Sequence, residues 1–234
     1  MSKFKSIGIV GGAGPMASAL LYGKIIQECQ SRFGSVEDTD FPEMVILNFP
    51  FSSMINLDAS EKNRNKIIVE LQSCIDKLVA LEVDIVAIAC NTLHSFIADI
   101  DFKGLKLCNL IQITKEAAKQ QRLKNLLFLG TATSRDNNLY NDDELNTTYV
   151  DVAQQKIVSE VIYVILKGKS SPSEVNQLIA IIKQNLQACD AVVLGCTEFS
   201  VLYDLYSSEF NGDIILLDPL TLLVDRLLQL AVNN

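Results

Sequence analysis

Cys90 and Cys196 are the two residues whose type and setting in this sequence best suit chemistry. Each ends a short apolar run, at residues 84–89 and 190–195, and has a threonine within two positions after it. The apolar runs predict buried strands, and in parallel α/β sheets ligands gather where such strands end. A cysteine at a helix N-terminus can have its pKa lowered from about 8.5 to roughly 3.5–7.5, which makes a thiolate available near neutral pH. The simpler interpretation is that both are core residues, because free cysteine packs as a small hydrophobe.

Two thiols of this kind could act as acid and base on opposite faces of one small carboxylate substrate. Inverting a stereocentre through a planar intermediate needs a base on one face and an acid on the other, and reversibility exchanges their roles. Each sulfur would approach the reacting carbon to about 3–3.5 Å, which leaves the sulfurs too far apart for a disulfide. Asn91 or Thr92, and Thr197, are suited to cap the helices that follow. With the backbone N–H groups after each cysteine, they would hold the carboxylate.

The setting of the two cysteines is repeated within the chain. Asp84 and Asp190 each lie six residues before a cysteine, with an apolar segment between. Upstream, residues 7–14 and 126–134 are both apolar segments that open into small, polar loops. The repeat predicts two structurally similar halves.

The rest of the chain alternates between strand and helix patterns. Further strands are expected at residues 6–10, 44–49, 105–110, 126–129 and 214–217, and helices at 66–81, 153–166, 174–186 and 220–232. This alternation favours right-handed βαβ crossovers and mainly parallel sheets. We therefore predict an α/β fold with two similar Rossmann-like domains. Residues 1–97 plus 211–234 would carry Cys90, and residues 98–210 would carry Cys196.

Composition and charge restrict the classes of partner. The chain has 28 acidic and 20 basic residues, so its field repels phosphate backbones and anionic membrane surfaces. No apolar stretch approaches the length of about 18–20 residues that crosses a bilayer, and the first 14 residues lack a signal-peptide pattern, so we expect a cytoplasmic location. Six cysteines without a C-x-x-C pair, and a single histidine, give no zinc-type spacing, so no metal site is expected.

The glycine loop after the first strand allows two interpretations. Gly12-Ala-Gly-Pro-Met-Ala fits the G-x-G-x-x-A dinucleotide fingerprint. The fingerprint also requires an acidic residue at the end of the second strand, where this chain has Asn48-Phe49-Pro50, and Pro15 has no N–H to face a phosphate. We therefore favour a glycine turn at Gly12 that lets the backbone approach a small ligand.

Four short motifs resemble a known family. GGAGP after the first strand, ACNTLH around Cys90, GCTE around Cys196 and LDPL near Asp218 are similar to the aspartate/glutamate racemase family, most of all to PLP-independent aspartate racemases. The resemblance implies two α/β domains, often in a homodimer, with the active site in the cleft between the domains and no cofactor. It also implies a dicarboxylic amino acid as substrate. One cysteine would take the α-proton as thiolate while the other delivers a proton from the opposite face.

Three further residues each have a functional and a structural interpretation. Thr131 could hydrogen-bond a carboxylate or simply form a turn. Lys167 matches a lysine with which the family's aspartate racemases bind the substrate carboxylate, but it also suits the C-terminal dipole of a helix. His94, four residues after Cys90, could tune that thiol or be a hydrogen-bonded structural histidine.

One departure from the family bears on the substrate. The family's Asp-Arg pair after the second strand is replaced here by residues 50–56, PFSSMIN, so no arginine is in register; Arg64 lies further along and could substitute or be a solvated helix residue. Two alternatives to racemisation therefore stay open. One is maleate isomerase-like chemistry with a nucleophilic cysteine, and the other is a catalytically silent carboxylate-binding protein.

Overall fold

A computed structural model describes residues 3–52, 61–210 and 214–232. The chain divides into two compact units, Met1–Leu110 with Leu220–Asn234 (unit 1) and Ile111–Pro219 (unit 2). Each unit contains one sheet of four strands, all parallel. The predicted α/β fold with two parallel-sheet domains is confirmed.

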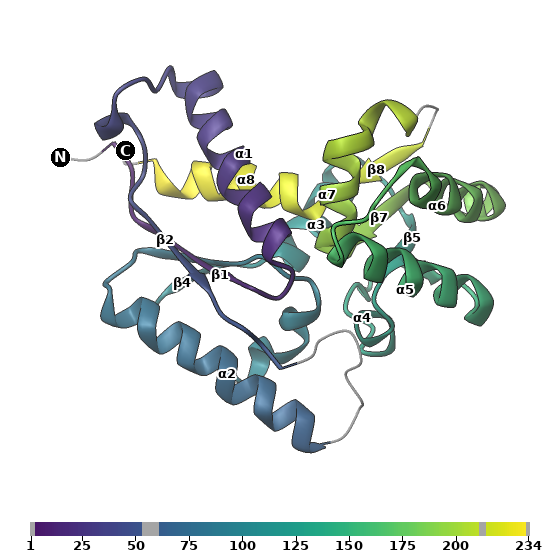
Figure 1. Ribbon diagram of the computed structural model, residues 1–234, viewed down its shortest axis with the longest axis horizontal. Coiled ribbons are helices and arrows are strands. Elements are labelled where there is room, and N and C mark those ends of the chain that lie inside the picture. Colours follow the sequence, from purple (N-terminus) through teal and green to yellow (C-terminus); the bar gives the residue numbers. More distant parts are fainter. Residues whose placement is uncertain (1–2, 53–60, 211–213, 233–234) are drawn as a thin grey trace. The chain divides into compact units, whose positions relative to one another are not determined.

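Unit 1 has the strand order β2-β1-β3-β4. Its elements are β1 (Ile7–Gly11), α1 (Pro15–Phe33), η1 (Asp38–Asp40), β2 (Met44–Asn48), α2 (Glu61–Ala80), β3 (Ile85–Ile88), η2 (Thr92–Asp99), β4 (Lys106–Cys108) and most of α8 (Pro219–Ala231). In Figure 1, α1 and α8 cover one face of this sheet and α2 covers the other. The α2 face is closed by the apolar stripe that the 3.6-residue period predicts, with Ile67, Leu71 and Leu78 packed against Val86 and Ile88 of β3.

Unit 2 repeats this arrangement with the order β6-β5-β7-β8. Its elements are most of α3 (Leu110–Gln120), then β5 (Asn125–Gly130), α4 (Ala132–Asp136), β6 (Asn146–Tyr149), α5 (Val152–Leu166), α6 (Pro172–Asn185), η3 (Leu186–Ala188), β7 (Ala191–Gly195), α7 (Thr197–Tyr206), η4 (Ser207–Glu209) and β8 (Ile215–Leu217). Helices α5, α6 and α7 bury one face of the sheet against Leu127, Leu129, Val192 and Leu194.

The structure places the unit boundaries later than the sequence does. The predicted boundaries assign β4 to the second domain and β8 to the first, but β4 pairs with β3 and β8 pairs with β7. Each fourth strand belongs with the sheet that it completes, because its backbone hydrogen bonds go there. The sequence pattern also misses β6, whose residues Asn146-Thr-Thr-Tyr149 contain no apolar run; as an edge strand β6 does not need one.

The aspartate that recurs six residues before each cysteine has a structural role. The Oδ2 atom of Asp84 accepts hydrogen bonds from the N–H and the hydroxyl of Ser6, both at 2.8 Å. The Oδ2 atom of Asp190 accepts from the N–H groups of Lys124 and Asn125, also at 2.8 Å. These backbone hydrogen bonds hold the pKa of both carboxyls below the usual value. Each aspartate thus ties the start of one central strand to the start of its neighbour, at the sheet edge opposite the cysteine.

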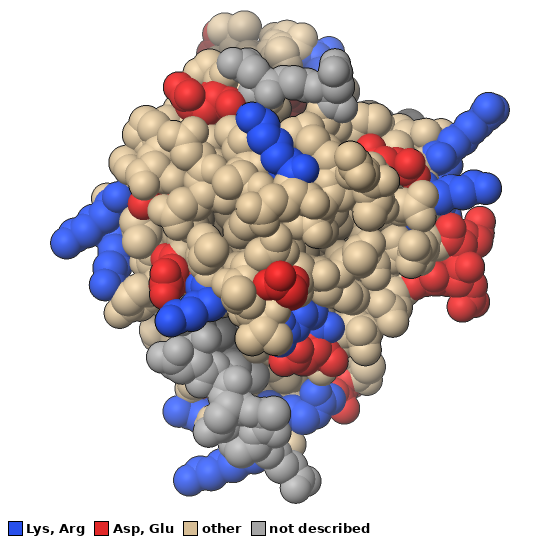
Figure 2. Space-filling model, turned by 90° about the vertical axis from the view of Figure 1, so that its right-hand side faces the viewer, with Lys and Arg blue, Asp and Glu red and all other residues tan. Residues whose placement is uncertain are grey.

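Most of the face drawn in Figure 2 is uncharged, and the charged side chains of both signs lie mainly toward its margins. Among the described helices, none combines the length and the apolar character that a membrane crossing requires.

Candidate active site

In unit 1, Cys90 lies at the carboxyl edge of the sheet, two residues after the end of β3. The N–H of Ala89 donates to the carbonyl of Val10 at 3.0 Å, so Cys90 follows directly on the last contact between β3 and β1. Cys90 is 8% exposed, and Asn91 and Thr92 are buried. Asn91 occupies the N-cap position, but its side chain makes no capping hydrogen bond, and the helix that follows is a 3₁₀ helix. The three predicted residues are therefore brought together, in a tighter turn than the expected α-helix.

His94 is held by both ring nitrogens. Its Nδ1 lies 2.8 Å from the carbonyl oxygen of Cys90, and the N–H of Leu110 points to its Nε2 at 3.3 Å. Because a carbonyl only accepts and an N–H only donates, the ring is the neutral tautomer with its proton on Nδ1. Burial lowers the pKa of His94 to about 4. Of the two interpretations, the geometry supports the structural one, since His94 fixes the backbone of Cys90 and contributes no charge.

Gly12 is required by close backbone contact. Its φ is +97°, and a Cβ at this position would lie 2.1 Å from the carbonyl oxygen of Phe49. The N–H of Gly12 donates to the Ser18 hydroxyl at 3.3 Å. The backbone that Gly12 admits is therefore that of the loop after β2, and an approach of this glycine to a small ligand stays a prediction.

The loop after β2 is held by a carboxylate. The Oε2 atom of Glu70 accepts from the Ser52 N–H at 2.9 Å, and its Oε1 atom accepts from the Ser52 hydroxyl at 2.5 Å. The rest of the stretch in which the family's Asp-Arg pair is expected, residues 53–56, lies outside the described residues. Arg64 forms an ion pair with Asp99, and its guanidinium lies 5.5 Å from the ring centroid of Phe96. Arg64 is thus engaged on the surface of unit 1, in line with the interpretation as a solvated helix residue.

In unit 2, Cys196 lies at the equivalent edge and is the N-cap residue of α7. Its Sγ lies 2.8 Å from Oε2 of Glu198, and both residues are buried, at 5% and 6% exposure. Thr197 is buried and forms the first residue of α7, so the prediction that Thr197 caps this helix is wrong. The cap position belongs to Cys196, because the strand ends one residue earlier.

Glu198 is a functional candidate that the sequence analysis does not single out. Burial raises the pKa of its carboxyl, although hydrogen bonds from Cys196, from its own N–H and from Thr197 act in the opposite direction. The signal was present in the GCTE motif, but a glutamate in the first turn of a helix is equally typical of a dipole contact. Only the side-chain geometry shows that its carboxyl reaches the thiol.

Thr131 is brought beside this cysteine. It follows Gly130, which pairs in register with Gly195, so Thr131 and Cys196 succeed neighbouring residues of adjacent strands. The Oγ1 atom of Thr131 accepts from the Ser134 N–H at 3.2 Å, and the residue caps α4. Thr131 is therefore a turn-forming residue, and it lies at the same sheet edge as Cys196.

The sequence of this chain matches an established protein family. The family model described as Asp/Glu/Hydantoin racemase matches residues 10–227. The chain belongs to this racemase family. Among curated relatives, the broad specificity amino-acid racemase RacX of Bacillus subtilis (strain 168) is 26% identical over 225 residues, which cover 87% of this chain and 89% of RacX.

Solved structures show the same fold. The Picrophilus torridus aspartate racemase has a TM-score of 0.78 at 24% identity, covering 96% of this chain and 93% of its own. An aspartate racemase homologue from Pyrococcus horikoshii OT3 has a TM-score of 0.73 at 20% identity, covering 97% and 98%. Glutamate racemase from Francisella tularensis subsp. tularensis SCHU S4, in complex with D-glutamate, has a TM-score of 0.64 at 15% identity, covering 98% and 81%. Both the family and the fold expected from the motifs are confirmed.

Lys167 is not brought to Cys196 within unit 2 of this racemase-family chain. Helix α5 begins at the carboxyl edge, where the Gln155 amide donates to the carbonyl of Gly130 at 3.0 Å. Lys167 follows the other end of α5, about 18 Å further along at about 1.5 Å per residue. There it is the C-cap residue, and its Nζ lies 4.0 Å from the ring centroid of Tyr163. Its position within unit 2 agrees with the helix-dipole interpretation.

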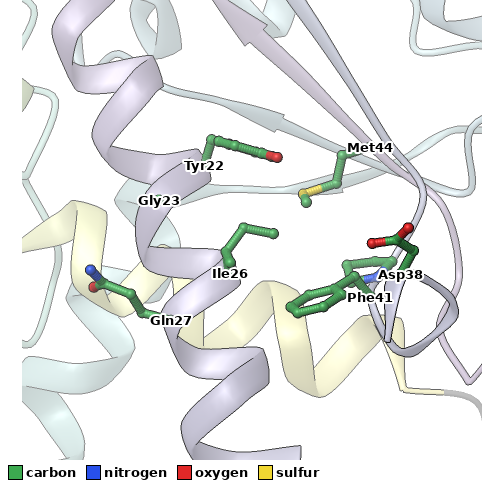
Figure 3. A pocket seen from close by; sticks show the side chains of 8 residues that line it. Tyr22, Gly23, Ile26, Gln27, Asp38, Phe41 and Met44 are labelled. Carbon is green, nitrogen blue, oxygen red and sulfur yellow. The ribbon is translucent and has the colours of Figure 1, made fainter. Parts of the chain in front are cut away.

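A groove with a volume of about 600 Å³ lies elsewhere in unit 1. In Figure 3, Tyr22 and Ile26 of α1 point toward Phe41 and Met44 across it. Because Met44 begins β2, the groove lies toward the amino edge of the sheet, whereas Cys90 lies at the carboxyl edge. The groove is therefore separate from the candidate active site.

Proposed function

We propose that the protein is a cofactor-independent amino-acid racemase in which Cys90 and Cys196 are the acid and the base at the substrate Cα. The observation that carries this proposal is the equivalence of the two cysteines. Each lies just beyond the carboxyl end of the third strand of its sheet, and each is more than nine-tenths buried. A reversible inversion of Cα needs two groups of matched chemistry, and family membership supports racemase chemistry for this chain.

The residues around the two thiols suit the binding of an α-carboxylate. Asn91 and Thr92 follow Cys90, and Thr197 follows Cys196, so a hydroxyl and backbone N–H donors accompany each thiol, and Cys90 has the Asn91 amide in addition. Thr131 adds a hydroxyl at the unit 2 edge. Such donors would stabilise charge as it spreads onto the substrate's carboxylate. The enzyme would act as a homodimer in the cytoplasm.

Aspartate and glutamate are the first substrates to test, because the aspartate racemase resemblance points to a dicarboxylic amino acid. The panel must extend to neutral side chains. Arg64 is paired with Asp99, and Ser52, in the described part of the stretch that departs from the family pattern, is bound by Glu70. The relative RacX is described as having broad specificity.

The test is deuterium incorporation at Cα in heavy water together with chiral chromatography of the panel. Wild-type protein is expected to racemise at least one amino acid with exchange at Cα. Cys90→Ala and Cys196→Ala should each abolish racemisation, while each retains exchange of one enantiomer through the remaining thiol. Cys74→Ala, at a fully buried helix cysteine whose pKa is raised to about 11 by burial, is the matched control and should racemise normally.

Two results would contradict the proposal. Isomerisation of maleate without amino-acid exchange would indicate a nucleophilic cysteine on the same scaffold. Binding of amino acids without exchange in any of them would indicate a silent binding protein.

A further inference from the structure

We infer that Glu198 is a positioning residue that holds the proton of Cys196 while that thiol is ionised. The inference rests on the proposed function for its catalytic consequence, but its physical basis lies within unit 2. Cys196 Sγ and Glu198 Oε2 are 2.8 Å apart, within hydrogen-bonding distance, and both residues are buried. His94, the histidine of the ACNTLH motif, contacts the carbonyl of the other cysteine, Cys90.

Charge decides how this pair shares its protons. A thiolate and a carboxylate 2.8 Å apart in a buried site would repel each other strongly, because like charges in a poorly solvated site cannot both ionise. The pair therefore carries at most one negative charge near neutral pH. When Cys196 is a thiolate, Glu198 is a neutral acid whose O–H donates to the sulfur. When Cys196 is a thiol, its S–H is free to donate to the Glu198 carboxylate.

The proton balance of the two half-reactions follows from this. With one proton on the pair, that proton moves from Sγ to Oε2, and the thiolate then takes the Cα proton of the substrate. The pair now holds two protons, one on Sγ and one on Oε2, and no charge. In the reverse direction Sγ returns its proton to Cα while Glu198 keeps the other. Every proton comes from Cα or from the pair, and no further reactant is needed.

Two substitutions distinguish proton sharing between Glu198 and Cys196 from simple repulsion of the thiolate by the carboxylate. Glu198→Met fills a similar volume with no hydrogen-bond donor, and Glu198→Gln keeps a neutral N–H donor. Without Glu198 as proton acceptor and donor, the Cys196 thiolate loses its stabilisation. A carboxylate that merely repels the thiolate would predict the opposite effect of both changes.

The first measurement is the rate of alkylation of Cys196 by iodoacetamide at pH 7, read from the mass of its peptide. Glu198→Met is expected to slow alkylation by about tenfold or more, the effect of one pKa unit. Glu198→Gln should react clearly faster than Glu198→Met. The control is Glu174→Gln. Glu174 is another buried carboxyl of unit 2 and belongs to the capping box of α6, so Cys196 in this variant should be alkylated as fast as in wild type. Faster alkylation in both Glu198 variants than in wild type would overturn the inference.

The second measurement uses single-cysteine backgrounds. In Cys90→Ala, exchange of one enantiomer proceeds through Cys196, and adding Glu198→Met should lower it by about 10²-fold, with partial rescue by Glu198→Gln. In Cys196→Ala, exchange of the other enantiomer should change by less than about twofold on adding Glu198→Met, because Glu198 acts through Cys196. Equal losses in both backgrounds would overturn the inference. The predicted alkylation pattern without exchange of any amino acid would support the role of Glu198 and contradict racemisation.

Discussion

The ring of Phe128 occupies the space in which a side chain at Gly195 would have to lie. A Cβ at Gly195 would be 2.0 Å from Cε2 of Phe128, and a Cβ at Gly130 would be 2.4 Å from Cζ of the same ring. Phe128 also packs against Tyr140 and Tyr149, with ring centroids 5.3 and 5.5 Å away. The residue before Cys196 must therefore be glycine because the strand beside it carries this ring.

Gly195→Ala is expected to destabilise unit 2 and displace Cys196. Overpacking of this kind costs about 1–3 kcal/mol, measurable as a lower urea midpoint together with altered alkylation of Cys196. Adding Phe128→Leu, which makes room for the methyl group, should recover part of the loss, since the two sites are in contact. Additive losses in the double variant would contradict the assigned contact.

Gly12→Ala is expected to destabilise unit 1, because alanine at φ +97° is strained and its Cβ would meet the Phe49 carbonyl. Backbone strain alone costs of order 1–3 kcal/mol. The matched control is Gly23→Ala in the middle of α1, where a Cβ meets nothing within 4 Å. Higher helix propensity should stabilise that variant by about 0.5–1 kcal/mol. Equal effects on the two urea midpoints would refute the contact between Gly12 and Phe49.

His94 is expected to make the fold sensitive to mild acid. Burial lowers the pKa of His94 from 6.5 to about 4. Between these values the unfolded chain binds a proton that the folded chain does not, so stability falls as the pH falls. The contribution amounts to about 3 kcal/mol at about 1.4 kcal/mol per pH unit. Urea unfolding between pH 7 and 4 should show this fall in the free energy of unfolding of the wild type. The dependence on pH should be weaker in the His94→Asn variant, whatever the absolute stability of that variant.

Asp190→Ala is expected to lower the urea midpoint without changing alkylation of Cys196. The carboxylate accepts from the N–H groups of Lys124 and Asn125 at the amino edge of the sheet, whereas Cys196 lies at the carboxyl edge. The hydrogen bonds lower the pKa of Asp190, so its stabilising contribution is present above pH 3.8 and is lost as the pH falls below that value. A change in Cys196 reactivity with an unchanged midpoint would contradict this division between structural and reactive residues.

Arg64→Ala is expected to leave KM for any racemised amino acid within about twofold, because its guanidinium is committed to Asp99 and Phe96. The side chains of the ion pair are 43% and 42% exposed, so its loss should cost at most about 1 kcal/mol of stability. Steady-state kinetics over the amino-acid panel tests this expectation. A large rise in KM for aspartate and glutamate alone would restore Arg64 as the substrate's cation.

Much of the fold could be predicted because the strands of each sheet that lie in its interior are apolar on both faces. Ile85–Ile88 and Ala191–Gly195 are fully buried, so they read as continuous apolar runs that end abruptly at a cysteine. The edge strand β6 and the exact domain boundaries could not be predicted in this way. Edge pairing depends on backbone hydrogen bonds, which polar residues such as Thr147 and Thr148 form as well as apolar ones.

The sequence by itself determined the two-fold repeat, the pair of cysteines and the racemase motifs, because these depend on local patterns of residue type. Only the tertiary structure decided which neighbours act on those residues. It directs His94 to the backbone of Cys90, Glu198 to the thiol of Cys196 and Arg64 to Asp99. The physical reason is that side-chain direction and burial, which set hydrogen bonds and pKa values, are fixed by packing between segments that the linear sequence does not place together.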